Sequence, residues 1–326
     1  MASVEQPEKQ PLLEEQTEVE VKEELDEAPK STWWQRVGSA LFYCVGSFVI
    51  TLSNKAVLTS FGFPSADVLG LCQLVATVVV LAVGRLFGVV RIPEMTLEIF
   101  LQVWPLPGLF LGNLLFGLVG MQYLSLPIFI ALRRFTIVMT LLAEVLILRS
   151  VPRASVLLAV GVMTLGAVVA AMNDLSVTLL GVVYVLLNNA CSATQGVFVK
   201  RCVAQLGPLG VLHYNALLAL PLTALLVASS GGVVAAWNFD AWNDWQFVLL
   251  FAVSCVMGVV LQYSVVLCVH HNSPLTAATM GSVKNVSVTY IGMFVGGDYV
   301  FTMLNFIGLN VSVAGTILYM WVTFKK

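Results

Sequence analysis

Charged side chains are scarce in this sequence: they make up 10% of its 326 residues, whereas 59% of the residues are hydrophobic. A soluble globular domain has about 25% charged and about 45 to 50% apolar residues. This shortage excludes an ordinary soluble enzyme, because too few charges remain to cover a water-facing surface. A bilayer is the remaining solvent, so we expect an all-α membrane protein.

Residues that carry enzyme chemistry are also few. The six cysteines and three histidines show no metal-ligand or redox spacing, and the sequence has no Walker loop and no nucleophile elbow. A paired general acid and base is missing from the apolar segments. We therefore expect no catalytic residue, metal, cofactor, disulfide framework or nucleic-acid partner.

The acidic charge is concentrated at the N-terminus. Residues 1–30 carry ten acids and three lysines, a net charge of −7, whereas residues 31–326 carry a net charge of +5. Few apolar side chains accompany these charges, which predicts a disordered tail over 1–32. Within it, Leu12 and Leu13 resemble an acidic dileucine sorting signal for an adaptor, although such short patterns also occur by chance.

The body of the chain contains ten apolar runs. About 20 residues of helix are needed to cross a hydrocarbon core of about 30 Å. The predicted spans are 37–58, 67–90, 97–119, 124–148, 154–172, 178–200, 209–229, 246–269, 274–295 and 301–323. With the tail in the cytosol, twelve of the 16 Lys and Arg residues fall on the cytosolic side. This distribution predicts that both termini are cytosolic.

Four bases fall inside the predicted spans, where a charge needs a cavity or a partner. They are Lys55, Arg133, Arg134 and Lys284, whereas Glu144 is the only acid inside the spans away from their ends. The excess of positive charge predicts an anionic ligand. For Lys55 an alternative is that its side chain snorkels to the interface.

A weak internal repeat relates the two halves of the body. A shift of 147 residues pairs Pro127 with Pro274 and Gly161 with Gly308. Each half, 33–172 and 173–326, has five predicted spans, and an odd number makes the two repeats inverted.

The repeat places basic residues on equivalent helices. Arg133 and Arg134 follow Pro127, and Lys284 follows Pro274. From opposite sides of a pseudo-twofold axis, these cations could clamp a pyrophosphate, with Arg as a bidentate fork and Lys as a point charge.

Three motifs carry a resemblance to a known family: residues 281–286, 290–301 and 304–310. They resemble the nucleotide-sugar transporters of the drug/metabolite transporter superfamily, closest to the animal transporters for UDP-glucuronic acid and UDP-N-acetylhexosamines. The resemblance implies ten helices in the membrane of the Golgi or endoplasmic reticulum. It also implies exchange of a cytosolic nucleotide sugar for a lumenal nucleoside monophosphate.

The resemblance also assigns site residues. Tyr214 and Asn215 match the base-reading motif of GDP-mannose relatives, whose second Asn is replaced here by Ala216, which favours uracil over guanine. The matched motif on the ninth span supplies Gly281, Ser282, Lys284 and Asn285, with Lys and Asn in the order of the UDP-sugar branch. On the first span, Tyr43, Asn54 and Lys55 match the family spacing. Asn215 and Asn285 offer amides to the nucleoside, and Tyr214 and Tyr43 offer rings that can stack on the base.

Gln262 and Tyr263, in the eighth predicted span, are further candidates for the pocket lining. The sequence thus predicts an antiporter that exchanges a UDP-sugar for UMP by alternating access. A translocator of smaller organic phosphates and a non-transporting sorting or scaffold protein are the alternatives. The choice among UDP-glucuronic acid, UDP-N-acetylglucosamine and UDP-N-acetylgalactosamine stays open, as does the choice between monomer and homodimer.

Overall fold

The computed structural model describes residues 31–124, 126–171, 178–283 and 303–325. Within these ranges all regular elements are helical, which confirms the predicted all-α class. In chain order they are α2 (Trp33–Lys55), η1 (Ala56–Ser60), α3 (Ala66–Leu86), α4 (Leu97–Val103), α5 (Pro105–Tyr123), α6 (Leu126–Arg133), α7 (Thr136–Ile147), α8 (Ala154–Ala171), α9 (Leu179–Ser229), α10 (Gly232–Trp237), η2 (Asp240–Asn243), α11 (Trp245–His271) and α13 (Met303–Phe324). Residues 274–283 are also helical.

Side-chain caps determine where several helices begin. At the start of α2, the Gln35 amide donates to Thr32 Oγ1 at 3.4 Å and the Thr32 amide donates to Gln35 Oε1 at 2.8 Å, which forms a capping box. Such caps satisfy backbone amides that have no partner within the helix. At the starts of α3, α4, α9 and α11, a backbone amide of the first turn donates to the side chain of Ser65, Thr96, Thr178 and Asp244, respectively.

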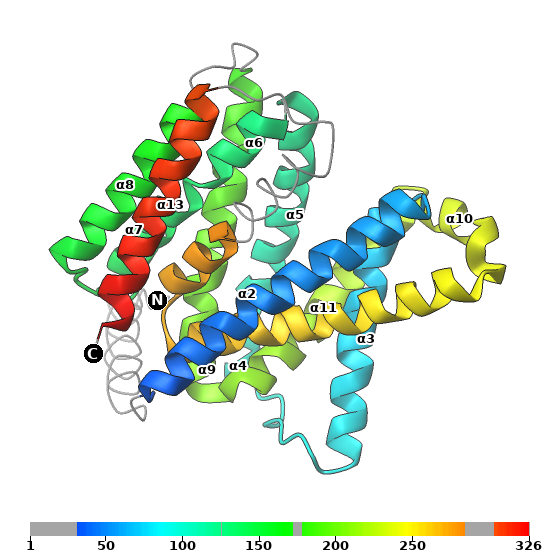
Figure 1. Cartoon of the computed structure of the whole chain (residues 1–326). Coiled ribbons are helices and arrows are strands. Elements are labelled where there is room, and N and C mark those ends of the chain that lie inside the picture. Colours follow the sequence, from blue (N-terminus) through cyan, green and yellow to red (C-terminus); the bar gives the residue numbers. More distant parts are fainter. Residues whose placement is uncertain (1–30, 125, 172–177, 284–302, 326) are drawn as a thin grey trace, which may run out of the picture.

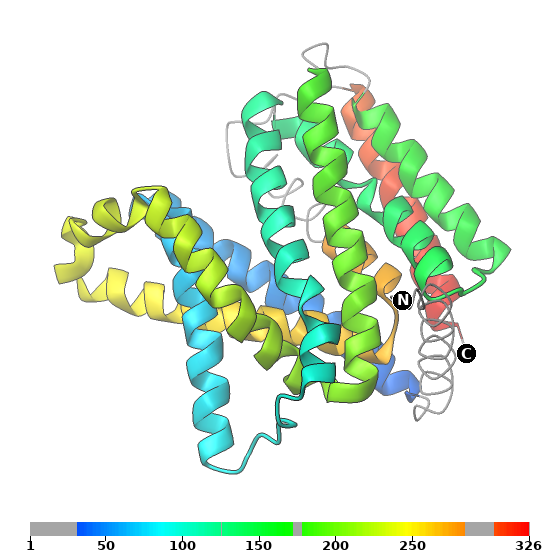
Figure 2. The same ribbon diagram turned by 180° about the vertical axis from the view of Figure 1, so that it is seen from behind.

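Helix α9 is two helices joined at Gly207. This glycine has φ 66° and ψ 170°, and Pro208 follows it. A positive φ strains most residues but not glycine, and proline cannot continue the hydrogen-bonding pattern of a preceding helix. The chain therefore turns back here, as Figure 2 shows for the green to yellow-green helix. The two arms correspond to the predicted spans 178–200 and 209–229.

The outer surface of the bundle is apolar. Large hydrophobic side chains such as Leu52, Val79 and Leu249 are exposed, although a soluble protein would bury most of them. In the described part of the chain, six helices are long and apolar enough to cross a bilayer. They confirm a multi-pass membrane protein. The ten-span arrangement stays a prediction.

The helices form two groups that share α9 (Figure 1). Helices α5 and α7 pack on α9, and α8 pairs with α13 beside them, whereas α2 and α3 pack on α11. The start of α2 contacts the end of α13: Trp33 Nε1 donates to the Phe324 carbonyl at 2.9 Å, and Arg36 Nη2 donates to the Thr323 carbonyl at 2.9 Å. The first and last described helices thus meet at one end of the molecule, which we call the terminal end.

Glycines allow α8 and α13 to approach closely, as small residues do in membrane helices. A Cβ at Gly166 would lie 2.6 Å from the Gly308 carbonyl oxygen, and a Cβ at Gly315 would lie 2.7 Å from the Met163 amide nitrogen. Gly161, which the repeat pairs with Gly308, has nothing within 4 Å of its would-be Cβ. The close contact to Gly308 is therefore made by Gly166 and not by Gly161.

We expect Gly166→Ala to destabilise the protein by about 1 to 3 kcal/mol, because the added methyl group would press on the backbone of α13. Gly161→Ala on the same helix is the matched control and should change stability by less than about 1 kcal/mol. Thermal denaturation of both variants in detergent measures the difference. Equal melting temperatures would contradict the packing described here.

Candidate functional site

The predicted span 124–148 is broken in the structure. Helix α6 ends at Arg133 and α7 begins at Thr136. The sequence predicted one continuous helix here, and that prediction is wrong because two residues at the centre form a turn. Broken helices are tolerated at membrane depth only where other groups satisfy the freed backbone atoms.

Two side chains near the break bond to its carbonyls, and the Phe135 amide also donates to the Leu132 carbonyl at 3.0 Å. Asn189 of α9 donates through Nδ2 to the Leu132 carbonyl at 2.9 Å. The Thr136 hydroxyl lies 2.6 Å from the Arg133 carbonyl oxygen and 2.8 Å from Asn189 Oδ1. Asn189 is fully buried, so these bonds are made away from water. The break is therefore a built feature of the fold.

A chain of amides holds the side chain of Arg133. Its Nη1 donates to Asn188 Oδ1 at 2.6 Å, and Asn188 Nδ2 donates in turn to Asn113 Oδ1 at 2.8 Å. The three residues come from α6, α9 and α5. Because Asn188 is fully buried, it fixes the guanidinium from the protein side and leaves its remaining donors for other partners.

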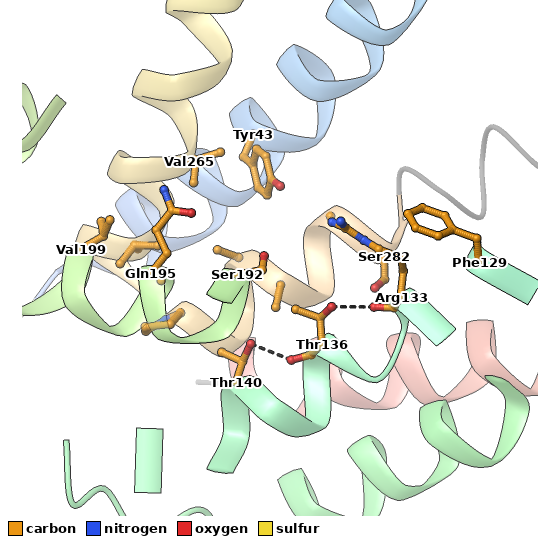
Figure 3. A pocket seen from close by; sticks show the side chains of 16 residues that line it. Tyr43, Phe129, Arg133, Thr136, Thr140, Ser192, Gln195, Val199, Val265 and Ser282 are labelled. Carbon is orange, nitrogen blue, oxygen red and sulfur yellow. Dashed lines mark hydrogen bonds between the residues drawn. The ribbon is translucent and has the colours of Figure 1, made fainter. Parts of the chain in front are cut away.

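Arg133 lines a cavity of about 450 Å³ between α2, α6, α7, α9, α11 and the helical residues 274–283. Figure 3 shows Tyr43, Gln195, Ser192 and Arg133 arranged around it. We call it the central cavity. Its lining is formed by Tyr43, Phe129, Arg133, Thr136, Thr140, Ser192, Gln195, Gly196, Val199, Val265, Val269, Pro274, Ala277, Ala278, Gly281 and Ser282.

Four of the predicted site residues meet at this cavity: Tyr43, Arg133, Gly281 and Ser282. Tyr43 and Gly281 lie against each other, since a Cβ at Gly281 would be 3.1 Å from the Tyr43 hydroxyl. Any side chain at position 281 would therefore displace Tyr43 or narrow the cavity.

Other predicted residues lie away from the central cavity. Arg134 is buried, and Lys55 is exposed at the end of α2. Asn54 Oδ1 accepts from Gln73 Nε2 at 2.9 Å and from Ser254 Oγ at 2.6 Å, which ties α2 to α3 and α11.

The predicted nucleoside residues of α9 also face elsewhere. The Tyr214 hydroxyl donates to the Pro93 carbonyl, and Asn215 is half-buried beside it in the chain. Gln262 and Tyr263 are half-buried on α11 without reaching the cavity lining. Lys284 and Asn285 lie outside the described residues. The roles proposed for all these residues stay predictions.

Sequence reasoning missed four polar residues of the lining: Thr136, Thr140, Ser192 and Gln195. Thr136 and Thr140 are four residues apart, and Ser192 and Gln195 are three apart, so each pair lies on one helix face. Polar pairs at helical spacing inside apolar spans were the signal that could have found them. In the described part of the chain, no cluster of three or more His, Cys, Asp or Glu could hold a metal ion, and the six cysteines are free.

A polar cavity beside a broken helix, inside an apolar helical bundle, is the arrangement of a secondary transporter. Comparison with known proteins agrees with this class. The chain belongs to the triose-phosphate transporter family, whose sequence model matches residues 37–320. It is therefore a member of a transporter family and not an enzyme.

Several relatives within this family are nucleotide-sugar transporters, as the motifs at 281–310 predicted. The UDP-sugar transporter UST74c of Drosophila melanogaster is 48% identical over 295 residues, covering 90% of this chain and 79% of that protein. Nucleotide sugar transporter SLC35D2 of Homo sapiens is 43% identical over 293 residues, covering 89% and 87%. The UDP-sugar transporter sqv-7 of Caenorhabditis elegans is 42% identical over 304 residues, covering 91% and 92%.

A crystal structure of another protein shares the fold alone. It is 14% identical, with a TM-score of 0.62, and the match covers 88% of this chain and 97% of that one.

We expect Asn189→Ala to destabilise the protein by about 1 to 2 kcal/mol, because the Leu132 carbonyl keeps only the Phe135 amide as a donor and Thr136 loses its contact with the Asn189 side chain. Asn243→Ala is the control, since Asn243 is exposed in the short helix η2. That variant should stay within about 0.5 kcal/mol of the parent. Thermal denaturation compares the two, and an undiminished melting temperature for Asn189→Ala would contradict the role given to Asn189.

Proposed function

We propose that this chain is a nucleotide-sugar transporter that exchanges a cytosolic UDP-sugar for lumenal UMP across the membrane of the endoplasmic reticulum or Golgi. The relatives named above support the substrate class, because three proteins with at least 42% identity are described as UDP-sugar or nucleotide-sugar transporters. The observation that carries the proposal is the guanidinium of Arg133, held by Asn188 at the wall of a polar cavity.

Arg133 is suited to bind a diphosphate. Guanidinium donors form charge-assisted, often bidentate hydrogen bonds with phosphate oxygens. Asn188 occupies Nη1 from behind, so the other nitrogen donors are available to a ligand in the cavity. Of the other predicted phosphate contacts, Lys284 would add positive charge at the cavity, whereas Arg134 and Lys55 lie away from its lining and would add only to the surrounding electrostatic field. Lys284 would do so two residues beyond Ser282, a lining residue of the same cavity.

The rest of the lining suits the nucleoside and the sugar. Hydroxyl and amide groups of Thr136, Ser192 and Gln195 can donate to or accept from the uracil carbonyls and the sugar hydroxyls. Tyr43 offers an aromatic face for stacking, and about 450 Å³ is within the usual size of a ligand site. The identity of the sugar depends on which of these groups it reaches.

Exchange follows from the charge of the site. A buried cation without an anion in a low-dielectric interior is costly, so the empty carrier should cross slowly. A UDP-N-acetylhexosamine and UMP each carry about two negative charges near neutral pH, so their exchange is nearly electroneutral, whereas the carboxylate of UDP-glucuronic acid adds a third charge. Binding of either ligand lowers the electrostatic free energy of the transition in which Arg133 changes its exposure from the cytosol to the lumen.

Alternating access would use two inverted repeats, 33–172 and 173–326. The close pairing of α8 with α13, the fifth and tenth predicted spans, supports such a pseudo-twofold arrangement. The terminal end gathers Arg36, Arg153, Lys200 and Lys325 around one cavity, which favours a cytosolic position for this end. The dileucine at Leu12 and Leu13 lies outside the described residues, and its use by a sorting adaptor and the pairing of subunits stay predictions.

We expect Arg133→Gln to reduce UDP-sugar uptake at least about tenfold, because the diphosphate loses a charged hydrogen-bond partner. Uptake is measured in proteoliposomes that contain equal amounts of folded protein, as judged by size-exclusion chromatography. Arg91→Gln removes an exposed base between α3 and α4 and should transport normally. Full transport by Arg133→Gln would remove the central support of the proposal.

We also expect uptake of labelled UDP-sugar to require UMP on the opposite side. Vesicles preloaded with UMP should take up the label many times faster than empty vesicles, because the unloaded carrier returns slowly. Preloading with triose phosphates separates the proposal from a translocator of smaller organic phosphates. If triose phosphates drive uptake as well as UMP does, that alternative is favoured. If no preload drives any uptake, the sorting or scaffold role gains support.

A further inference from the structure

A second cavity, of about 690 Å³, opens at the terminal end. We call it the end cavity. Its lining contains four Lys or Arg residues, two histidines and one carboxylate. They are Arg36, Arg153, Lys200, Lys325, His270, His271 and Glu144. The remaining lining is largely polar and includes Thr276, Tyr319 and Thr323.

The two cavities share no lining residue, and neighbouring residues face opposite sides. Pro274 lines the central cavity, whereas Leu275 lines the end cavity. The same division separates Val199 from Lys200 on α9 and Val269 from His270 on α11. A thin layer of protein therefore closes the central cavity toward the terminal end.

Glu144 and Lys200 build this layer. Glu144 Oε1 accepts from the Leu275 amide at 2.5 Å, at the start of the helical residues 274–283. Lys200 Nζ donates to the carbonyls of Val269, His270 and Asn272 at 2.9, 2.8 and 2.8 Å, at the end of α11. Each side chain neutralises the helix end that it caps. The single carboxylate of the lining is thus bonded to a helix N-terminus, and the remaining cations of the lining are Arg36, Arg153 and Lys325.

Those cations come from three separate elements. Arg36 of α2 is half-buried, and its position is set by the Thr323 carbonyl and by the ring of Phe324, 5.8 Å from the guanidinium carbon. Lys325 follows α13, with Nζ 4.4 Å from the centre of the Trp321 ring. Arg153 precedes α8 and is exposed. Like charges from three elements around one polar hollow repel one another unless an anion joins them.

We propose that the end cavity is a second anion site, distinct from the central cavity, which binds the phosphate groups of an organic phosphate through Arg36, Arg153 and Lys325. The phosphate comes either from a soluble nucleotide or from a phosphorylated lipid headgroup, since basic pockets at the ends of membrane helices suit both. The site needs neither the UDP-sugar chemistry nor Arg133.

The test measures binding of inorganic pyrophosphate by titration calorimetry in a neutral detergent at low ionic strength. Arg133→Gln serves as the background, because it removes the central guanidinium. We expect this variant to bind pyrophosphate. Adding Arg153→Gln and Lys325→Gln should weaken binding at least about tenfold, because two charged partners are lost. Both added positions are exposed, so folding is preserved.

Arg85→Gln with Arg91→Gln in the same background is the matched control. Both residues are exposed and lie outside the end cavity, so the loss of charge is equal and binding should be unchanged. Equal weakening by the two pairs would overturn the proposal, as would undiminished binding after Arg153→Gln and Lys325→Gln. Absence of pyrophosphate binding in the Arg133→Gln background would overturn it too. If the Arg133→Gln variant folds poorly, both pairs of substitutions are compared in the protein with Arg133 intact.

Nanodiscs separate the two sources of phosphate. If phosphatidylinositol 4-phosphate reduces pyrophosphate binding relative to pure phosphatidylcholine, a lipid headgroup is the occupant. If the lipid does not reduce pyrophosphate binding, the occupant is a soluble phosphate. Either result presupposes that pyrophosphate binds in the end cavity. Failure of UDP-sugar exchange with retained pyrophosphate binding would overturn the proposed function and leave this site standing.

Discussion

The hydrogen bonds that Asn188 and Asn189 make at the break between α6 and α7 are the interactions on which the central cavity depends. A bilayer supplies no water to backbone groups, so a helix can open at mid-depth only if protein atoms take the place of its lost bonds. Asn189 is a second donor to the Leu132 carbonyl beside the Phe135 amide, its Oδ1 lies within hydrogen-bond distance of Thr136, whose hydroxyl reaches the Arg133 carbonyl, and Asn188 holds the guanidinium of Arg133. Structure and binding chemistry are therefore coupled through two adjacent residues of α9.

The same principle operates at the terminal end. There the chain breaks between α11 and residues 274–283, and charged side chains replace amides as the capping groups. Glu144 and Lys200 are strong caps because each meets a helix end of opposite partial charge. The two breaks differ in the charge that they leave. At the first break, Asn188 and Asn189 are neutral, so the positive charge of Arg133 remains at the central cavity. At the second break, the opposite charges of Glu144 and Lys200 leave little net charge in the closing layer.

Much of this arrangement could be predicted from the sequence. The rest depends on contacts between residues that are far apart in the chain, which one sequence does not reveal. Scarce charge and long apolar runs predicted a helical membrane protein, and Arg133 inside a span predicted an anion site. The break after Arg133 carried no proline or glycine at its centre, so local propensity pointed to a continuous helix. Tyr214 matched a family motif, yet its hydroxyl reaches the Pro93 carbonyl because the Gly207 bend aims that arm of α9 elsewhere. The capping role of Lys200 needed contacts about 70 residues apart in the chain.

Helix α9 runs without interruption from Asn188 to Lys200, well before its bend at Gly207. Twelve residues of helix measure about 18 Å, or about three fifths of a hydrocarbon thickness of about 30 Å. Because this stretch is one continuous helix, it sets the separation between Asn188, which holds Arg133 at the central cavity, and Lys200, which caps α11 in the layer between the two cavities. A change in this separation would require α9 to bend or unwind between residues 188 and 200.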